Sequence, residues 1–191
     1  MMYTGVYTVI NGGVKLKDVK KLTYTALLTA WAIIIPFVFG FMSITVPPFS
    51  ATLTAHVPMF LSMFLGPGAA VMTGLGSALG FFITKGPIIG ARALMHAFVG
   101  LIGAVLLRKG VSFNKVVLLT APVHALLEAL VVLGFLTFGA QVKYVGSVAN
   151  FLIITVGVGT ILHHGVDAVI SFVVAKSISK ATKVDLVKQN I

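Results

Sequence analysis

Three pairs of ionisable side chains lie within otherwise apolar stretches of this chain. The pairs are Arg92 with His96, His124 with Glu128, and His163 or His164 with Asp167. Each pair is three or four residues apart, which places its members on one face of a helix. Ionisable side chains inside a membrane are costly and usually serve function. The spacing therefore predicts three helices that each turn a polar face toward a common cavity.

Arg92 suits an anionic partner because its guanidinium can donate two parallel hydrogen bonds to a carboxylate or phosphate. With the topology derived below, Arg92 lies about 7 Å beneath the outer surface. Two interpretations stay open. Arg92 holds an anionic group of a ligand that enters from outside, or it forms an internal ion pair with Glu128 or Asp167.

The other two pairs allow similar alternatives. His124 and Glu128 either contact the ligand or form an interhelical hydrogen bond. His163, His164 and Asp167 lie deeper and nearer the cytoplasm, so we expect them to serve packing or coupling.

Two isolated polar residues are further candidates. Asn150 either binds an amide or carboxylate of the ligand or caps the start of its helix. His56 either helps to close the site or ends a helix without contacting ligand.

The amino-acid composition indicates that this protein lies in a membrane. Of its 191 residues, 58% are hydrophobic and only 9% are charged, and the mean hydropathy is +1.08. A soluble domain needs a more highly charged surface. The net charge of +10 would suggest nucleic acid in a soluble protein, but here the basic residues flank apolar segments and indicate membrane topology. The absence of cysteine excludes disulfides and thiolate chemistry.

Six apolar segments predict an all-α integral membrane protein with six transmembrane helices. They cover about residues 21–42, 55–65, 69–84, 88–107, 114–138 and 145–175. If the N-terminus is cytoplasmic, eleven basic residues lie inside: Lys15, Lys17, Lys20, Lys21, Arg108, Lys109, Lys115, Lys176, Lys180, Lys183 and Lys188. Only Lys85 and Lys143 lie outside. This bias predicts that both termini are cytoplasmic.

The predicted organisation has three parts: a cytoplasmic segment 1–20, a membrane domain 21–178 and a cytoplasmic tail 179–191. Residues 43–54 are expected to form a loop. The second apolar segment is the weakest element of this topology, because a full crossing needs about 20 residues.

The sequence contains few features that indicate an enzyme. The chain has no nucleophile elbow, phosphate-binding loop or dinucleotide motif, so we expect no enzyme, no cofactor and no metal. Two functions stay open as alternatives to ligand binding without transport or catalysis. One is a secondary transporter that uses Glu128 and Asp167. The other is an intramembrane metalloenzyme that uses His124, Glu128, His163 and Asp167. The second alternative follows from spacings that resemble those of metal ligands.

The stretch Lys21-Leu-Thr-Tyr-Thr-Ala-Leu-Leu-Thr-Ala30 after a basic run, the Pro-rich first loop and the Gly66-Pro-Gly turn resemble S components of energy-coupling factor (ECF) vitamin transporters. The similarity covers about residues 20–178. The stretches Pro47–Phe60 and Ala91–His96 are similar to the branch for small B-vitamins such as niacin or pantothenate. Both vitamins carry a carboxylate, in agreement with the first interpretation of Arg92.

The resemblance implies roles for individual residues. Ala26 and Ala30 would dock on a transmembrane coupling subunit that carries two ATPases. The first loop, with Phe49, would cap a site that faces outward. Its ligand contacts would come from that loop and the later helices, where Arg92, His96, His124, Glu128, Asn150 and His56 are the candidates. The implied function is high-affinity vitamin binding for an ATP-driven importer in a prokaryotic plasma membrane, with no nucleic acid partner.

Overall fold

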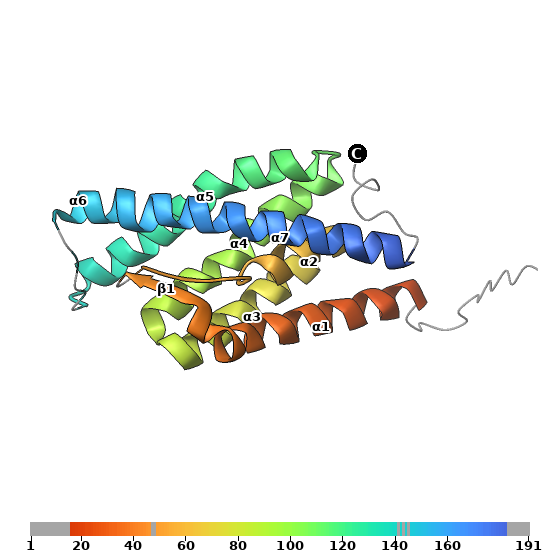
Figure 1. The fold of residues 1–191 in the computed structure, drawn as a ribbon, viewed down its shortest axis with the longest axis horizontal. Helices are drawn as coiled ribbons and strands as arrows, with labels where there is room; N and C mark the ends of the chain where they lie inside the picture. Colours follow the sequence, from red (N-terminus) through yellow and green to blue (C-terminus); the bar gives the residue numbers. More distant parts are fainter. Residues whose placement is uncertain (1–15, 47–48, 141, 143, 145, 183–191) are drawn as a thin grey trace, which may run out of the picture.

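The computed structural model describes residues 16–46, 49–140, 142, 144 and 146–182, which are mostly helical. Long helices lie side by side along the longest axis of the molecule (Figure 1). They are α1 (Leu16–Val38), α3 (Pro67–Lys85), α4 (Pro87–Arg108), α5 (Phe113–Thr137), and a continuous helical segment of α6 (Val148–Asn150), the π-helix η2 (Phe151–Val158) and α7 (Gly159–Thr182). These five helical stretches are long and apolar enough to cross a membrane.

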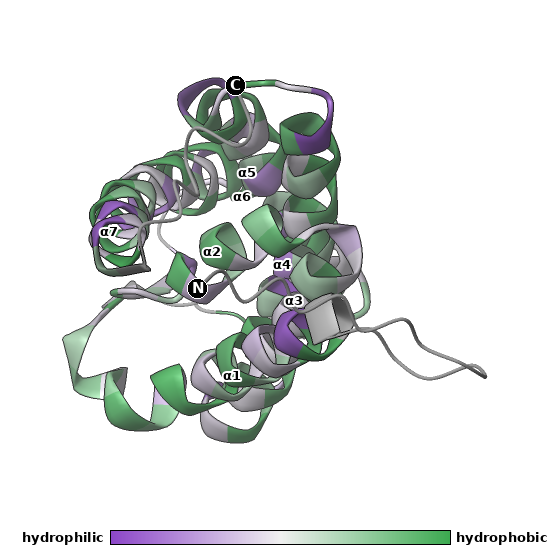
Figure 2. Ribbon diagram, turned by 90° about the vertical axis from the view of Figure 1, so that its right-hand side faces the viewer, coloured by the Kyte–Doolittle hydropathy of each residue, from purple (hydrophilic) through white to green (hydrophobic). Residues whose placement is uncertain are grey.

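The outer surface of the helices is apolar. Leu118 is 73% exposed, Val169 66% and Leu162 65%. Hydrophobic residues cover most of the helical ribbon in Figure 2. A soluble protein rarely exposes so much contiguous apolar surface, so these side chains are suited to contact lipid.

A short helix, α2 (Val57–Leu65), lies inside this bundle. Every residue from Val57 to Met63 is buried, as expected of a helix that is apolar on all sides. Gly103 of α4 makes room for it, because a Cβ on that glycine would lie 2.5 Å from the sulfur of Met63.

The segment between α1 and α2 differs from the predicted loop. After a short 3₁₀ turn, η1 (Gly40–Met42), the strands β1 (Ser43–Val46) and β2 (Phe49–Thr52) form an antiparallel hairpin. The β-branched residues of β1 favour extended backbone. The Ser43 and Thr52 hydroxyls join the open end of the hairpin at 2.7 Å. The segment expected to be a loop therefore contains a β-hairpin, which the predicted all-α fold did not include, whereas the rest of the described chain is mostly helical.

The second apolar segment does not cross a membrane as one helix. The nine residues of α2 rise only about 14 Å, against a hydrocarbon core of about 30 Å. Instead, the hairpin and α2 together return the chain along the bundle. Gly40 lies near Lys85 at one end, whereas Gly66 lies against the guanidinium of Arg108 at the other.

Close helix contacts depend on glycines of α3, because small residues let helix backbones approach closely. A Cβ on Gly74 would overlap the backbone of Ala97, and a Cβ on Gly80 would overlap that of Ile33. The chain turns sharply at Gly66 (φ +112°) and Gly86 (φ +85°), a conformation that favours glycine. A proline follows each of these glycines and begins the next helix.

Candidate functional site

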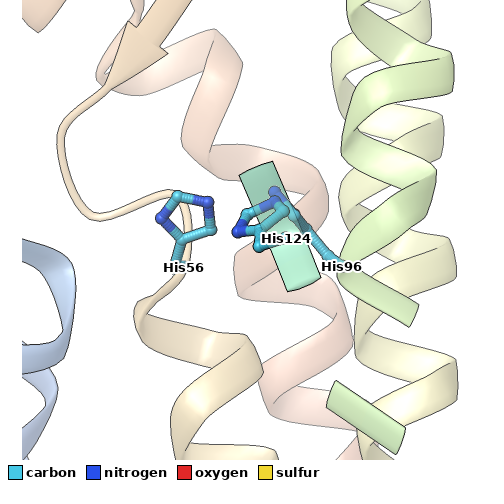
Figure 3. A group of neighbouring side chains, drawn as sticks. All are labelled: His56, His96 and His124. Atoms are coloured by element: carbon cyan, nitrogen blue, oxygen red, sulfur yellow. The ribbon is translucent and has the colours of Figure 1, made fainter. Parts of the chain in front are cut away.

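All five histidines of the chain come together in the centre of the bundle. The ring centroid of His56 lies 4.6 Å from that of His96, 4.8 Å from His124, 4.4 Å from His163 and 5.8 Å from His164. The rings come from the start of α2, from α4, from α5 and from α7. Figure 3 shows His56 facing His96 and His124. We call these five residues the histidine cluster.

Arg92 and Glu128 form a buried ion pair beside the histidine cluster. The Nη2 atom of Arg92 lies 2.6 Å from Oε2 of Glu128, and its Nε atom donates to the same oxygen at 3.2 Å. The Thr160 hydroxyl also donates to Oε2, and Nε2 of His124 lies 3.3 Å from Oε1. Glu128 therefore joins α4, α5 and α7 at one point.

Asp167 holds the junction of the hairpin and α2. Its carboxylate accepts hydrogen bonds from the backbone amides of Thr54 and His56, each at 2.9 Å. His163, one turn earlier on α7, places Nε2 2.9 Å from the carbonyl of Thr52 and 3.1 Å from Asp167. Because both neighbours of this Nε2 are acceptors, the tautomer protonated at Nε2 fits the geometry.

A small cavity lies between these two sets of interactions. Its volume is about 20 Å³, and its lining includes Arg92, His96, Glu128, His56 and His163. A space of this size holds about one water molecule. A ligand that consists of an aromatic ring and a carboxylate is too large for this space. Such a ligand could enter only if the hairpin or the neighbouring helices moved.

The structure brings together five of the seven side chains that the sequence predicts for the ligand site: Arg92, His96, His124, Glu128 and His56. Asn150 is exposed and is the last residue of the short helix α6. Ser147 caps this helix, because its side chain accepts from the backbone amide of Asn150. Ser147 therefore takes the capping role considered for Asn150, and contact of Asn150 with the ligand stays a prediction. The side chain of Phe49 lies outside the described residues.

The third polar pair belongs to the common cluster. His163 and His164 contact the rings of His56 and His124, and Asp167 holds the start of α2, a packing contact of the kind expected for this pair. Their spacing matched that of the other two pairs, so this signal was available in the sequence. The contacts of Ser77 with His96 and of Thr160 with Glu128 had no such signal, since hydroxyls are common in membrane helices.

Metal-ligating groups also converge here. Among the described residues, two sets of side chains are spaced to hold an ion: His56 with His96 and His124, and His56 with His163 and Asp167. Within each set, the ligand atoms lie within 4.8 Å of one another.

The predicted docking residues lie on the surface and not among the buried residues of this site. Ala26 and Ala30 of α1 are exposed, as are Leu22 and Ile34 on the same face. The neighbouring side of α1 packs on α3, where Thr29 meets Gly76 and Ile33 meets Gly80.

The sequence is similar to that of the niacin transporter NiaX of Lactococcus lactis subsp. cremoris (strain MG1363). The two chains are 34% identical over 180 residues, which cover 90% of this chain and 80% of the relative. No family model matches the chain, and no solved structure matches it significantly. Since the relative is a transporter, the similarity agrees with a multi-pass membrane protein that is not an enzyme.

Proposed function

The chain belongs to the family of niacin-type S components of ECF transporters that includes NiaX, and we propose that it binds niacin as the membrane subunit of an ATP-driven importer. Niacin is the substrate in the printed name of the relative. Pantothenate, the other vitamin suggested by the sequence, has no comparable support.

The observation that carries the proposal is the guanidinium of Arg92 at the central cavity. Arg92 is only 3% exposed and lies among aromatic and imidazole rings, including Phe81 and His96. A ligand with an aromatic ring and a carboxylate matches both features. In the present conformation Glu128 accepts the hydrogen bonds of Arg92, so the carboxylate of niacin would share or replace this acceptor.

The hairpin is the proposed cap of the ligand site. It contributes Ser50 and Thr52 to the cavity lining, and the carbonyl of Thr52 at its end accepts from His163 of α7. Because the closed cavity is too small for niacin, binding requires this cap to open. Opening exchanges the contacts of Asp167 and His163 with the hairpin for contacts with water.

Six passages of the chain through the membrane, with both termini cytoplasmic, fit this arrangement. The stretches α1, α3 and α5 run in one direction, and α2, α4 and α7 run in the other (Figure 1). The hairpin and α2 together supply the second passage. Described basic residues gather at the end that holds the start of α1 and the end of α7: Lys20, Lys21, Arg108, Lys109, Lys115, Lys176 and Lys180. The positive-inside rule assigns that end to the cytoplasm.

Coupling to ATP hydrolysis would occur through α1. Of the exposed residues Ala26 and Ala30, Ala26 lies in the half of α1 nearer this basic end and Ala30 lies one turn further along, and we infer that a coupling subunit with two ATPases binds on this face. Small residues allow close approach of a partner helix.

Binding by the purified chain alone tests the ligand. We expect isothermal titration calorimetry to detect tight binding of niacin, much weaker binding of nicotinamide, which lacks the carboxylate, and no binding of pantothenate. Binding of none of the three would refute the proposal.

Uptake tests the coupling. Radiolabelled niacin should enter cells that express the chain together with a coupling subunit and two ATPases, and should not enter cells that express the chain alone. Uptake by the chain alone that follows an ion gradient would instead identify a secondary transporter.

A further inference from the structure

We propose that His56, His96 and His124 form a binding site for one divalent transition metal ion of the zinc class. This site goes beyond the proposed binding of niacin and does not depend on it. Three imidazoles are a common ligand set for such ions. The three residues come from α2, α4 and α5, and their side chains are fully buried or nearly so.

Each of the three rings turns Nδ1 toward a partner outside the trio. Nδ1 of His96 lies 2.8 Å from the Ser77 hydroxyl, and Nδ1 of His56 lies 3.0 Å from Asp167. Nδ1 of His124 lies 3.2 Å from Nδ1 of His164. Metal-binding histidines typically engage one ring nitrogen in this way and offer the other to the ion. The arrangement leaves Nε2 of all three rings as the ligand atom.

One proposed ligand atom of the trio is a buried nitrogen that lacks a hydrogen bond, which a metal ion would explain. Nε2 of His124 has no hydrogen-bond partner, although it lies 3.3 Å from Glu128. A buried polar atom without a partner is costly. In Figure 3, one ring nitrogen of His56 points toward the other two rings.

The distances require only a small adjustment. In a tetrahedral zinc site, ligand nitrogens are about 3.3 Å apart. The ligand atoms of the trio already lie within 4.8 Å of one another. If side-chain rotations moved the ligand nitrogens by roughly 1 Å, the three histidines would surround an ion and leave a fourth position for water or another ligand.

The charges around the trio favour a cation. Two carboxylates, Asp167 and Glu128, contact its rings. One guanidinium, that of Arg92, pairs with Glu128. If the histidines are neutral, these charged groups sum to one negative charge, which a divalent ion would offset.

The second set of ligands, His56 with His163 and Asp167, is less suitable. Nε2 of His163 already forms a hydrogen bond with the carbonyl of Thr52. The Asp167 carboxylate already accepts hydrogen bonds from two backbone amides. An ion at this position would have to displace these contacts. The two sets share only His56, so variants of the other residues distinguish them.

The test uses the full chain in detergent after treatment with EDTA, titrated with Zn²⁺ in the absence of any vitamin. We expect one Zn²⁺ per chain by calorimetry, and a visible absorption spectrum typical of tetrahedral nitrogen ligation when Co²⁺ replaces Zn²⁺. His96→Gln and His124→Gln should each weaken Zn²⁺ binding by more than about 100-fold, and Ser77→Ala by about 10-fold to 100-fold. His163→Gln is the matched control and should retain binding.

Three results would overturn the proposal. The wild-type chain binds no Zn²⁺; it binds several ions weakly without the Co²⁺ spectrum; or His163→Gln abolishes binding and His96→Gln does not. The first two measurements use the wild-type chain, so the test stands even if a variant fails to fold. Niacin binding by the EDTA-treated chain is measured separately, so failure of the metal site and failure of the proposed function are distinguishable.

Discussion

Neutralising the Arg92–Glu128 pair is the sharpest test of how the site binds a carboxylate. Arg92→Gln alone would leave the buried charge of Glu128 without its cationic partner, which typically costs about 3–5 kcal/mol. Loss of binding could then reflect unfolding. The double variant Arg92→Gln/Glu128→Gln removes both charges and keeps two side chains that can hydrogen-bond to each other, so we expect it to fold.

The expected loss of affinity follows from the contact that Arg92 would make. A hydrogen bond to a charged group contributes about 1.5–3 kcal/mol. Since about 1.4 kcal/mol corresponds to tenfold in affinity, the double variant should bind niacin roughly 10-fold to 150-fold more weakly. Nicotinamide has the same ring without the charge. Its affinity should therefore change little between the wild type and the double variant.

The assay is calorimetric titration of both ligands into the wild type and the double variant, after thermal unfolding has verified that both are folded. The ratio of niacin to nicotinamide affinity is the decisive quantity, because general damage to the site lowers both affinities together. An unchanged ratio would refute the role of Arg92 and leave the Arg92–Glu128 pair as a purely structural link between α4 and α5.

Three further predictions concern coupling, the cap and packing. Ala26→Trp should abolish niacin uptake with the partner subunits and leave niacin binding intact, whereas Leu130→Trp, at a residue of α5 that is 52% exposed, should affect neither; loss of binding in Ala26→Trp would mean that this face is not a docking surface. Asp167→Asn replaces a charged acceptor of two backbone amides, so it should destabilise the start of α2 by about 1–3 kcal/mol. Hydrogen exchange of these amides should then become faster. An unchanged exchange rate would contradict the conclusion that Asp167 holds the start of α2. Gly80→Ala should lower thermal stability by about 1–3 kcal/mol because its Cβ overlaps α1, whereas Gly68→Ala, with no heavy atom within 4 Å of its Cβ, should not; equal melting temperatures would refute the close packing.

The helices were predictable because membrane helices are long, apolar and punctuated by Gly-Pro turns. The segment predicted at residues 88–107 is α4 (Pro87–Arg108), and the one predicted at 69–84 is α3 (Pro67–Lys85). The start of α1 was predicted less well. It begins at Leu16, within the part assigned to a cytoplasmic segment, because lysines are good helix formers and do not end a helix.

The hairpin was not predicted, because its strands are only four residues long and lie next to two prolines. Its formation depends on pairing between β1 and β2 and on contacts with α7. These contacts are not local in the sequence. The same limit applies to α2, whose length alone does not reveal that the hairpin completes its passage along the bundle.

By itself, the sequence determined the membrane environment, the bias of positive charge, and which side chains are polar enough to form a site. It also placed each pair on one helix face, because the spacing along a helix fixes which residues are neighbours. Only the tertiary structure decided that Arg92 pairs with Glu128, that Asp167 holds the start of α2 and that all five histidines meet. The reason is that helix periodicity fixes the direction of a side chain relative to its own axis, whereas the rotation and depth of one helix against another depend on packing, such as that of the glycines of α3 and α4.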